Sequence, residues 1–485
     1  MVNWFHEPAS VAWRIFALDT GIRIWMCSRV VLRRLPAGVA WAWISLILFL
    51  PLVATILYLF FGEYRQATRR VLRLEKAKRV LAMMAAQHKQ TGSRFEGEYA
   101  DFSRAYELMI GLPAQGGNDI ELLPNADRAF ERLALDIDNA QRSIDLEFYI
   151  WSDGGRADLF GQSLVRAAGR GVKIRLLVDA IGSAGFIKGG MLKSLRAAGI
   201  DVVIALPSGF WRSLFARPDL RIHRKIIVID GEIAYSGSMN LADPKFFKMD
   251  SGAGPWVDAL ARITGPAVAP LASVFLSDWC AETGLDFAAE VAAAPIKDIA
   301  SKKTAAIQCL PSGPAVKHSE IEQALLMAVA EAQKLLVLTT PYFLPSEAML
   351  YVLIAAARRG VQVTLIVPEK VDSHLTQLAS RSFFEDLLEA GVEIYLFQKG
   401  LLHTKSVVVD GRFSLFGTLN LDPRSLRINF EVTQAIYDRG FTEDLLRLQR
   451  AYLENSVRYD LESFNSRSSR EVWAADLARL VGPLL

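Results

Sequence analysis

The chain has 485 residues, of which 22% are charged and 52% are hydrophobic, and its formal net charge is +3. This length indicates two or three folded units, and the composition excludes a largely disordered protein. The small net charge gives no electrostatic reason to expect a nucleic-acid partner. The three cysteines are far apart and form no Cys-x-x-Cys pair, so they favour neither a disulfide framework nor a zinc site.

Residues 1–34 mix apolar and charged side chains. Arg14, Asp19 and Arg23 interrupt the apolar pattern, and each would be costly at the centre of a bilayer. We therefore expect this segment to be an amphipathic helix at a membrane interface, with a weak first span as the alternative.

A long apolar run follows, with no charged residue from Leu35 to Gly62. A run of this length can cross a hydrocarbon core of roughly 30 Å, and its proline, Pro51, is tolerated better in a membrane helix than in a soluble one. We expect a transmembrane helix over residues 35–62 and a juxtamembrane helical linker over residues 63–115. More arginine and lysine residues follow the run than precede it, so the positive-inside tendency places the rest of the chain in the cytoplasm.

The remainder of the chain repeats itself. Residues 164–178 match residues 353–367, and in both a helical pattern ends near glycine and a β-branched strand pattern follows. Alternating helices and strands indicate α/β units, and a repeat of this length indicates two copies of one domain. We expect the first domain over residues 116–287, the second over 304–485, and an alanine-rich linker over 288–303.

Each copy carries the same pattern, H-x-K-x4-D-x6-G-[ST]-x-N. One such match would be a moderate signal, but two matches with identical extensions inside a duplication are not a coincidence. The members of the pattern are His223, Lys225, Asp230, Ser238 and Asn240 in the first copy, and His403, Lys405, Asp410, Thr418 and Asn420 in the second.

On a strand, residues i and i+2 share a face, so the histidine and lysine of each copy point into the same space. If the two domains pair around a pseudo-twofold axis, both faces line one pocket. The lysines, the asparagines and the hydroxyls of Ser238 and Thr418 can then bind phosphate oxygens. One neutral histidine can attack phosphorus to form a phosphohistidine, while the other, protonated, donates a proton to the leaving alkoxide. This scheme needs no metal or other cofactor, and it leaves open which histidine is the nucleophile.

Four carboxylates complete the candidate site. Asp230 and Asp410 belong to the candidate catalytic set, although each ends a strand, where accepting hydrogen bonds at a turn is the favoured interpretation. A nucleophilic histidine needs an acceptor for its second ring nitrogen. Glu431 is the candidate for the histidine of the second copy and Asp258 for that of the first, with an ordinary salt bridge as the alternative for each.

The paired motifs resemble the phospholipase D superfamily, whose members include phospholipases, phosphatidyl transferases and a few nucleases. The chain is similar in particular to the bacterial cardiolipin synthases, which also carry an N-terminal anchor ahead of two such domains. The phrases that carry this narrower resemblance are Gly-Pro-Trp-Val-Asp at 254–258, Thr-Pro-Tyr-Phe at 340–343 and Asn-Leu-Asp-Pro-Arg-Ser at 420–425. That family usually has two clear membrane spans, whereas this sequence has one.

The resemblance implies an α/β fold of two tandem phospholipase D-like domains with mixed sheets flanked by helices. It implies an enzyme of the bacterial inner membrane that transfers a phosphatidyl group between two phosphatidylglycerol molecules, giving cardiolipin and glycerol. Its partners would be phosphatidylglycerol, other anionic phospholipids and the membrane, with no nucleic acid. The family pattern favours His223 as nucleophile and His403 as acid. A hydrolytic phospholipase D is the alternative function, and a phosphodiester nuclease is a more distant one.

Overall fold

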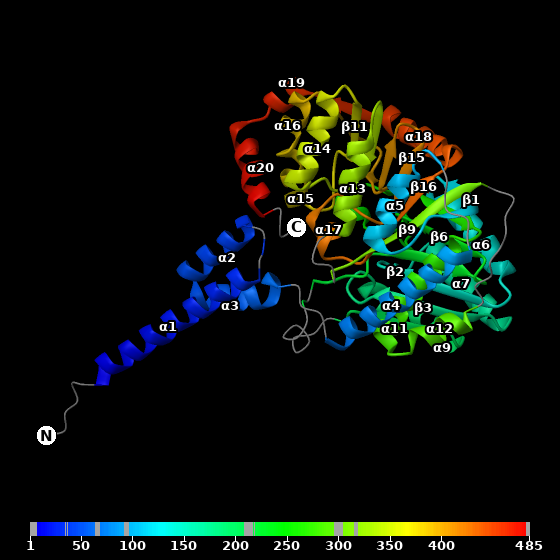
Figure 1. Ribbon diagram of the computed structural model, residues 1–485, viewed down its shortest axis with the longest axis horizontal. Helices are drawn as coiled ribbons and strands as arrows, with labels where there is room; N and C mark the ends of the chain where they lie inside the picture. The colour runs from blue at the N-terminus through cyan, green and yellow to red at the C-terminus, as the bar shows by residue number, and fades with distance from the viewer. Residues whose placement is uncertain are drawn as a thin grey trace. The chain divides into compact units, whose positions relative to one another are not determined.

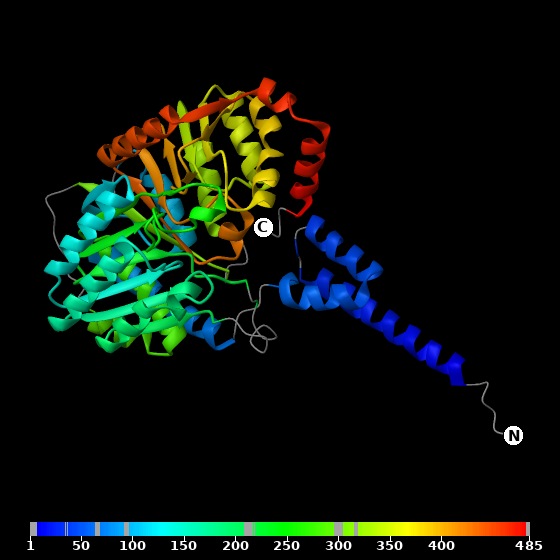
Figure 2. The same cartoon turned by 180° about the vertical axis from the view of Figure 1, so that it is seen from behind.

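The computed structural model describes residues 7–33, 35, 37–63, 68–91, 97–207, 217, 219–294, 304–314 and 319–481. The chain divides into two compact units (Figures 1 and 2). The smaller unit comprises Met1–Thr68 with Ser208–Asp219, and the larger one comprises Arg69–Pro207 with Leu220–Leu485.

The smaller unit is helical. Its elements are α1 (Glu7–Leu32), α2 (Ala37–Phe49), α3 (Pro51–Leu57) and the π-helical turn η1 (Tyr58–Gly62). A small core of apolar side chains from α1, α2, α3 and η1 holds these elements together, and the carboxylate of Glu63 accepts hydrogen bonds from Arg29 and Arg33.

The structure corrects the expectation of one transmembrane helix over residues 35–62. The helical run breaks at Leu50, because Pro51 has no backbone N–H and starts a new helix at its first turn. The helix α1 is longer, but it contains Arg14, Asp19 and Arg23. Among the described residues, no helix combines the length and the apolar character needed to cross a membrane.

The larger unit is built on one mixed sheet. Its first half contributes β1 (Gln115–Leu123), β2 (Ser143–Phe148), β3 (Lys173–Asp179), β4 (Asp201–Ala205), β5 (Lys225–Ile229), β6 (Ile233–Gly237) and β8 (Leu260–Thr264). Its second half contributes β9 (Ala305–Ser312), β10 (Leu335–Thr339), β11 (Gln362–Pro368), β12 (Glu393–Phe397), β14 (Ser406–Val409), β15 (Phe413–Gly417), β16 (Glu431–Tyr437) and β17 (Ser456–Tyr459).

The two halves have the same strand order. The first runs β1-β8-β6-β5-β2-β3-β4, and the second runs β9-β16-β15-β14-β10-β11-β12, with β17 added at its edge. In each half three strands are parallel and the others antiparallel. Antiparallel pairing of β1 with β9 joins the halves into one sheet of fifteen strands among the described residues. The expected α/β fold with a mixed sheet is confirmed.

Helices cover both faces of this sheet (Figure 1). The helices that follow the smaller unit along the chain are α4 (Thr68–Thr91), α5 (Ala100–Ile110), α6 (Ala126–Asn139), α7 (Arg156–Gly169), α8 (Ala184–Lys188), α9 (Gly190–Ala197), α11 (Val268–Thr283), α12 (Phe287–Ala293), α13 (Glu320–Glu331), α14 (Glu347–Arg358), α15 (His374–Arg381), α16 (Phe384–Glu389), α17 (Pro423–Arg427), α18 (Arg439–Glu454), α19 (Leu461–Asn465) and α20 (Ser469–Val481). Of these, α19 packs on α16 and α20 packs on α15. The α12 helix occupies the start of the expected linker, of which residues 295–303 lie outside the described residues.

One hydrophobic core is shared by both halves. Side chains of α11, such as Phe275 and Trp279, belong to the same buried cluster as Leu445 and Tyr452 of α18. A common core of this kind fixes the two halves of the larger unit against each other, and this fixed arrangement positions the motif residues.

Candidate active site

Each motif histidine lies immediately before a buried strand of its own half and is anchored on the backbone of the other half. The N–H of His223 donates to the carbonyl of Phe430 at 2.9 Å. The N–H of His403 donates to the carbonyl of Val257 at 2.8 Å, beside the short parallel pair β7 (Trp256–Val257) and β13 (Leu401–Leu402). The two motifs therefore meet where the halves meet.

The histidine side chains also cross between the halves. Nδ1 of His223 lies 2.8 Å from Oε2 of Glu431, and Nδ1 of His403 lies 2.7 Å from Oδ1 of Asp258. Sequence analysis identified both carboxylates but assigned each to the histidine of its own copy, and that pairing was wrong. Repeat alignment shows which residues are equivalent, but it does not show that the halves exchange them across a shared interface.

Burial sets the charge of these pairs. It lowers the pKa of His223 to about 4 and that of His403 to about 3. Burial alone would raise the pKa of Glu431 and of Asp258, but the hydrogen bond with the facing histidine and the nearby lysine charge hold both below their usual values. In the site as it stands, both imidazoles are neutral and both carboxylates are ionised. Nδ1–H then donates to the carboxylate, which leaves each Nε2 with a free lone pair.

The two lysines are almost fully buried, with 1% of Lys225 and 3% of Lys405 exposed. Each ammonium donates to the carbonyl of the histidine two residues earlier, His223 or His403. Burial lowers the pKa of Lys225 to about 8 and holds that of Lys405 well below its usual range. Each lysine also lowers the pKa of the histidine in the opposite half, so the two motifs share one electrostatic environment.

Two asparagines supply further polar groups. The amide oxygen of Asn240 accepts from the N–H of Ile150 at 3.1 Å, while its Nδ2 is buried without a hydrogen-bond partner in the described part of the chain. A buried donor without a partner is costly unless a ligand satisfies it. In Asn420 the buried oxygen is the atom left without a partner there. Among the described residues, Asn240 thus offers an unsatisfied amide donor, whereas Asn420 offers an unsatisfied acceptor.

The structure gives the two hydroxyls of the motif a different contact from the expected one. Thr418 Oγ1 donates to Oε2 of Glu431 at 2.6 Å, and Ser238 Oγ donates to the carbonyl of Ala259 at 3.2 Å. Both hydroxyls are therefore already engaged by the protein. Thr418 helps to hold the carboxylate that faces His223, which is a positioning role and not phosphate binding.

The motif aspartates do not face the histidines. Asp230 and Asp410 follow their strands at the far end, with positive φ of 54° and 53°. The Asp230 carboxylate accepts from the N–H groups of residues 141–143, and the Asp410 carboxylate accepts from those of residues 333–335. The inclusion of these two aspartates in the candidate catalytic set was therefore wrong. Each carboxylate instead fixes the start of a neighbouring strand.

Aromatic side chains enclose the imidazoles. The ring of Tyr149 lies 5.0 Å from that of His223, and the ring of Trp256 lies 4.2 Å from that of His403. Sequence analysis quoted Trp256 only as part of a family phrase and did not single out Tyr149. Tyr149 directly follows β2, whose last residue pairs with Lys225, so its position along the strand could have identified it.

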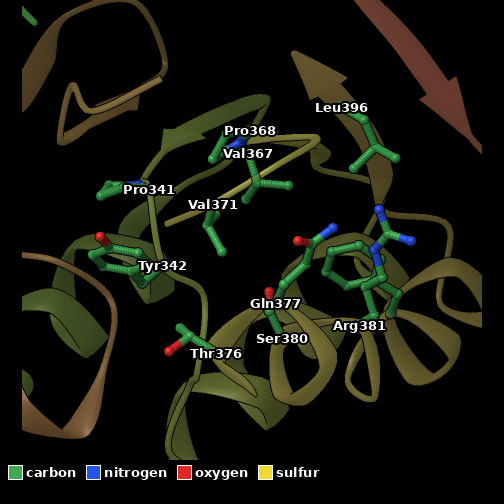
Figure 3. A pocket seen from close by; sticks show the side chains of 11 residues that line it. Pro341, Tyr342, Val367, Pro368, Val371, Thr376, Gln377, Ser380, Arg381 and Leu396 are labelled. Atoms are coloured by element: carbon green, nitrogen blue, oxygen red, sulfur yellow. The ribbon is translucent and has the colours of Figure 1, made fainter. Parts of the chain in front are cut away.

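A second group of residues lies on the His403 side, and sequence analysis quoted only Tyr342 of it, as part of a family phrase. Asp372 accepts from the hydroxyl of Tyr342 at 2.7 Å and from the ammonium of Lys248, in the first half, at 2.9 Å. Behind Tyr342 is a hollow of about 20 Å³. Figure 3 shows Tyr342 and Thr376 on one side of it and Leu396 and Arg381 on the other. This volume suits a water molecule and not a lipid headgroup.

The chain is similar to known proteins over most of its length. A family model described as "Cardiolipin synthase, PLD-like domain" matches residues 133–274 and 325–451, and one described as "Phospholipase_D-nuclease N-terminal" matches residues 22–63. Proteins named cardiolipin synthase A from Yersinia pseudotuberculosis and Yersinia pestis are 42% identical over 443 residues, which is 90% of this chain and 91% of each relative.

Among solved structures, the phosphatidylserine synthase of Haemophilus influenzae Rd KW20 matches with a TM-score of 0.58, covering 79% of this chain and 99% of that chain. Its sequence is only 16% identical, so this match supports the fold alone. The family model covers more than half of the chain, and the relatives align with nearly all of it. The chain therefore belongs to the cardiolipin synthases of the phospholipase D superfamily.

Proposed function

We propose that this chain is a phosphatidyltransferase that joins two phosphatidylglycerol molecules into cardiolipin and releases glycerol. The observation that carries this proposal is the crossed pair of buried histidine–carboxylate contacts, His223 with Glu431 and His403 with Asp258. The carboxylate that contacts each histidine comes from the other half, so the reacting groups belong to one composite site. Membership of the cardiolipin synthase family supports the choice of a lipid hydroxyl as acceptor.

In the first step, Nε2 of His223 attacks phosphorus and forms a P–N bond while the P–O bond to glycerol breaks. Lys225, Lys405 and Asn240 bind the non-bridging oxygens, where negative charge builds up. The anionic phosphodiester raises the pKa of His403, so that this imidazole binds a proton and delivers it to the departing glycerol oxygen.

In the second step, His403 accepts the proton of a hydroxyl on the second phosphatidylglycerol. That oxygen bonds to phosphorus as the P–N bond to His223 breaks, which returns His223 to its neutral form and leaves His403 protonated, as the next first step requires. We place leaving group and acceptor on the His403 side, where the segment of Lys248 and Trp256 meets Asp372 and both halves contribute polar groups. This arrangement supports His223 as the nucleophile, with Glu431 and Asp258 orienting the two rings.

We further propose that the chain contains two phospholipase D-like domains, residues 116–287 and 304–485, related by an approximate twofold axis. The shared strand order, the antiparallel pairing of β1 with β9 and the reciprocal histidine–carboxylate contacts support this arrangement. Such symmetry would place two equivalent motifs on opposite sides of one phosphorus atom.

The N-terminal unit supports a place at the bacterial inner membrane, and the excess of arginine and lysine after residue 62 supports the cytoplasmic side for the catalytic unit. The helices α1 to α3 expose many large apolar side chains, a surface that water solvates poorly and a bilayer interface accommodates. They include Trp13, Phe16, Trp25, Trp41, Phe49, Leu52 and Val53. Holding the enzyme at the bilayer would raise the concentration of its lipid substrates at the site.

The test is a product assay with the purified full chain and phosphatidylglycerol vesicles. Mass spectrometry should detect cardiolipin and glycerol in equal amounts, and His223→Ala should yield neither. Phosphatidic acid as the only lipid product would instead identify a hydrolytic phospholipase D.

A further inference from the structure

The segment of residues 244–255 leaves the first half and packs directly on the second. At its end, Gly254 has a φ of +79°, and a Cβ there would lie 3.0 Å from Cα of Gly400. The carbonyl of Pro255 accepts from the N–H of Leu401 at 2.9 Å. Backbone therefore meets backbone here, which leaves no room for a side chain and fixes this end of the segment.

The middle of the segment makes a different kind of contact. Nζ of Lys248 lies 2.9 Å from Oδ2 of Asp372 in the second half, and the hydroxyl of Tyr342 donates to Oδ1 of the same carboxylate. The Lys248 ammonium lies 5.5 Å from the ring centre of Trp256, the side chain that packs on His403. The Lys248–Asp372 bridge thus lies over the His403 side of the site and joins the two halves there.

We propose that the Lys248–Asp372 bridge limits the access of water to the phosphohistidine and so favours a lipid hydroxyl as acceptor. The proposal rests on the proposed function, in which both acceptors would use His403 as base. With a lipid hydroxyl, the P–O bond forms, the P–N bond to His223 breaks and cardiolipin results. With water the same bonds form and break, the proton goes to His403, and phosphatidic acid results.

The Lys248–Asp372 bridge is weak enough to open during each reaction cycle. The Lys248 side chain is 45% exposed and that of Asp372 is 14% exposed, so solvent and salt screen the pair. Lys248 also has a φ of +47°, a left-handed conformation that is unfavourable for a residue with a Cβ. A contact of this kind opens readily, as it must for glycerol to leave and for a second lipid to enter.

The experiment measures the ratio of phosphatidic acid to cardiolipin made by the full chain from phosphatidylglycerol vesicles. Asp372→Asn and Lys248→Ala should each raise this ratio about fivefold, which corresponds to roughly 1 kcal/mol. The double variant should raise it no further, because both changes remove the same contact. Lys245→Ala is the matched control, since it removes an exposed positive charge three residues away in the same segment.

Exchanging the charges, with Lys248→Asp and Asp372→Lys in one chain, should return the ratio toward the wild-type value. The ratio compares two products of the same folded enzyme, so a smaller folded fraction lowers both products and does not change it. A wild-type ratio in both single variants, with cardiolipin still the product, would overturn the bridge and leave the proposed function standing. Absence of cardiolipin from the wild-type reaction would instead overturn the proposed function.

Discussion

The two motif segments have the same pattern but are held by different forces. In the first, the residue between histidine and lysine is Arg224, whose guanidinium contacts Asp278 and donates to the carbonyls of Glu431 and Ser312, each at 3.0 Å. In the second it is Thr404, whose hydroxyl lies 2.9 Å from that of Tyr452. The position between the two motif residues therefore distinguishes the copies, one held by buried charge and the other by neutral hydrogen bonds.

The charged contacts of the first segment extend further into the protein. Arg70 of α4 lies 2.8 Å from Glu282 and 3.7 Å from Asp278, and its guanidinium stacks 4.2 Å from the ring centre of Phe430. Burial, together with the charge of Asp278, raises the pKa of Glu147 well above its usual range. The first segment thus has a network of buried charges that includes α4, in addition to the histidine–carboxylate contact that both copies have.

The largest expected effect concerns the phosphate site to which both halves contribute a lysine. If Lys225 and Lys405 bind one phosphate, Lys225→Ala and Lys405→Ala should each lower kcat/KM about 10³-fold, because either change removes charge stabilisation from the same transition state. Initial rates of cardiolipin formation check this. A large loss in one variant beside a wild-type rate in the other would break the shared-site account.

The next effect concerns the residue between the motif histidine and lysine, which differs between the halves. Arg224→Thr should lower the free energy of unfolding by about 3–5 kcal/mol, because it leaves Asp278 buried without its main partner. Thr404→Val should cost only about 1 kcal/mol, since it removes a neutral hydrogen bond. Chemical denaturation gives both values. Arg128→Ala is the control, because the Arg128–Glu131 pair is exposed. Equal losses at positions 224 and 404 would contradict the comparison.

A smaller effect tests the crossed carboxylates. Glu431→Gln and Asp258→Asn should each lower turnover about 10- to 100-fold, the usual cost of losing a group that orients a reactive histidine. NMR separates the two, because Glu431→Gln should shift the ring signals of His223 and leave those of His403 nearly unchanged. Signals that respond within the same copy, and not across copies, would contradict the crossed arrangement.

The smallest effect is on pH dependence. The pKa of Lys225 is lowered to about 8, so its ammonium loses its proton as the pH rises through that value. KM for phosphatidylglycerol should therefore rise by less than about tenfold between pH 7 and 9 as one positive charge is lost. Arginine stays charged in this range, so Lys225→Arg should give a flatter profile. The same rise in that variant would assign the titration to another group.

The sequence was sufficient for much of the site and for the repeated α/β fold. The repeat located both histidines and both lysines, and it identified Glu431 and Asp258 as their neighbouring carboxylates. Strand periodicity states which face a side chain occupies, but not which half lies opposite. The crossing of the carboxylates and the Lys248–Asp372 bridge depend on that packing and carry no local pattern.

The N-terminal expectation failed for another reason. Hydropathy alone treated residues 35–62 as one continuous span, and it gave Pro51 too little weight as a residue that starts a new helix. For the motif aspartates, in contrast, the local sequence favoured the contacts that the structure has. A turn position after a strand already favoured backbone hydrogen bonds for Asp230 and Asp410, and the structure has those bonds.

The most direct test of the central claim separates the two histidines in time. A phosphatidic acid ester of p-nitrophenol has a leaving group that needs no proton, so the first step can proceed without His403. Mixed with this substrate, His403→Ala should release one equivalent of p-nitrophenol in a burst and retain a phosphatidyl group on His223, detected by peptide mass spectrometry. His223→Ala should give no burst. A burst from His223→Ala, or a phosphatidyl group found on His403 of the wild-type chain, would contradict the account.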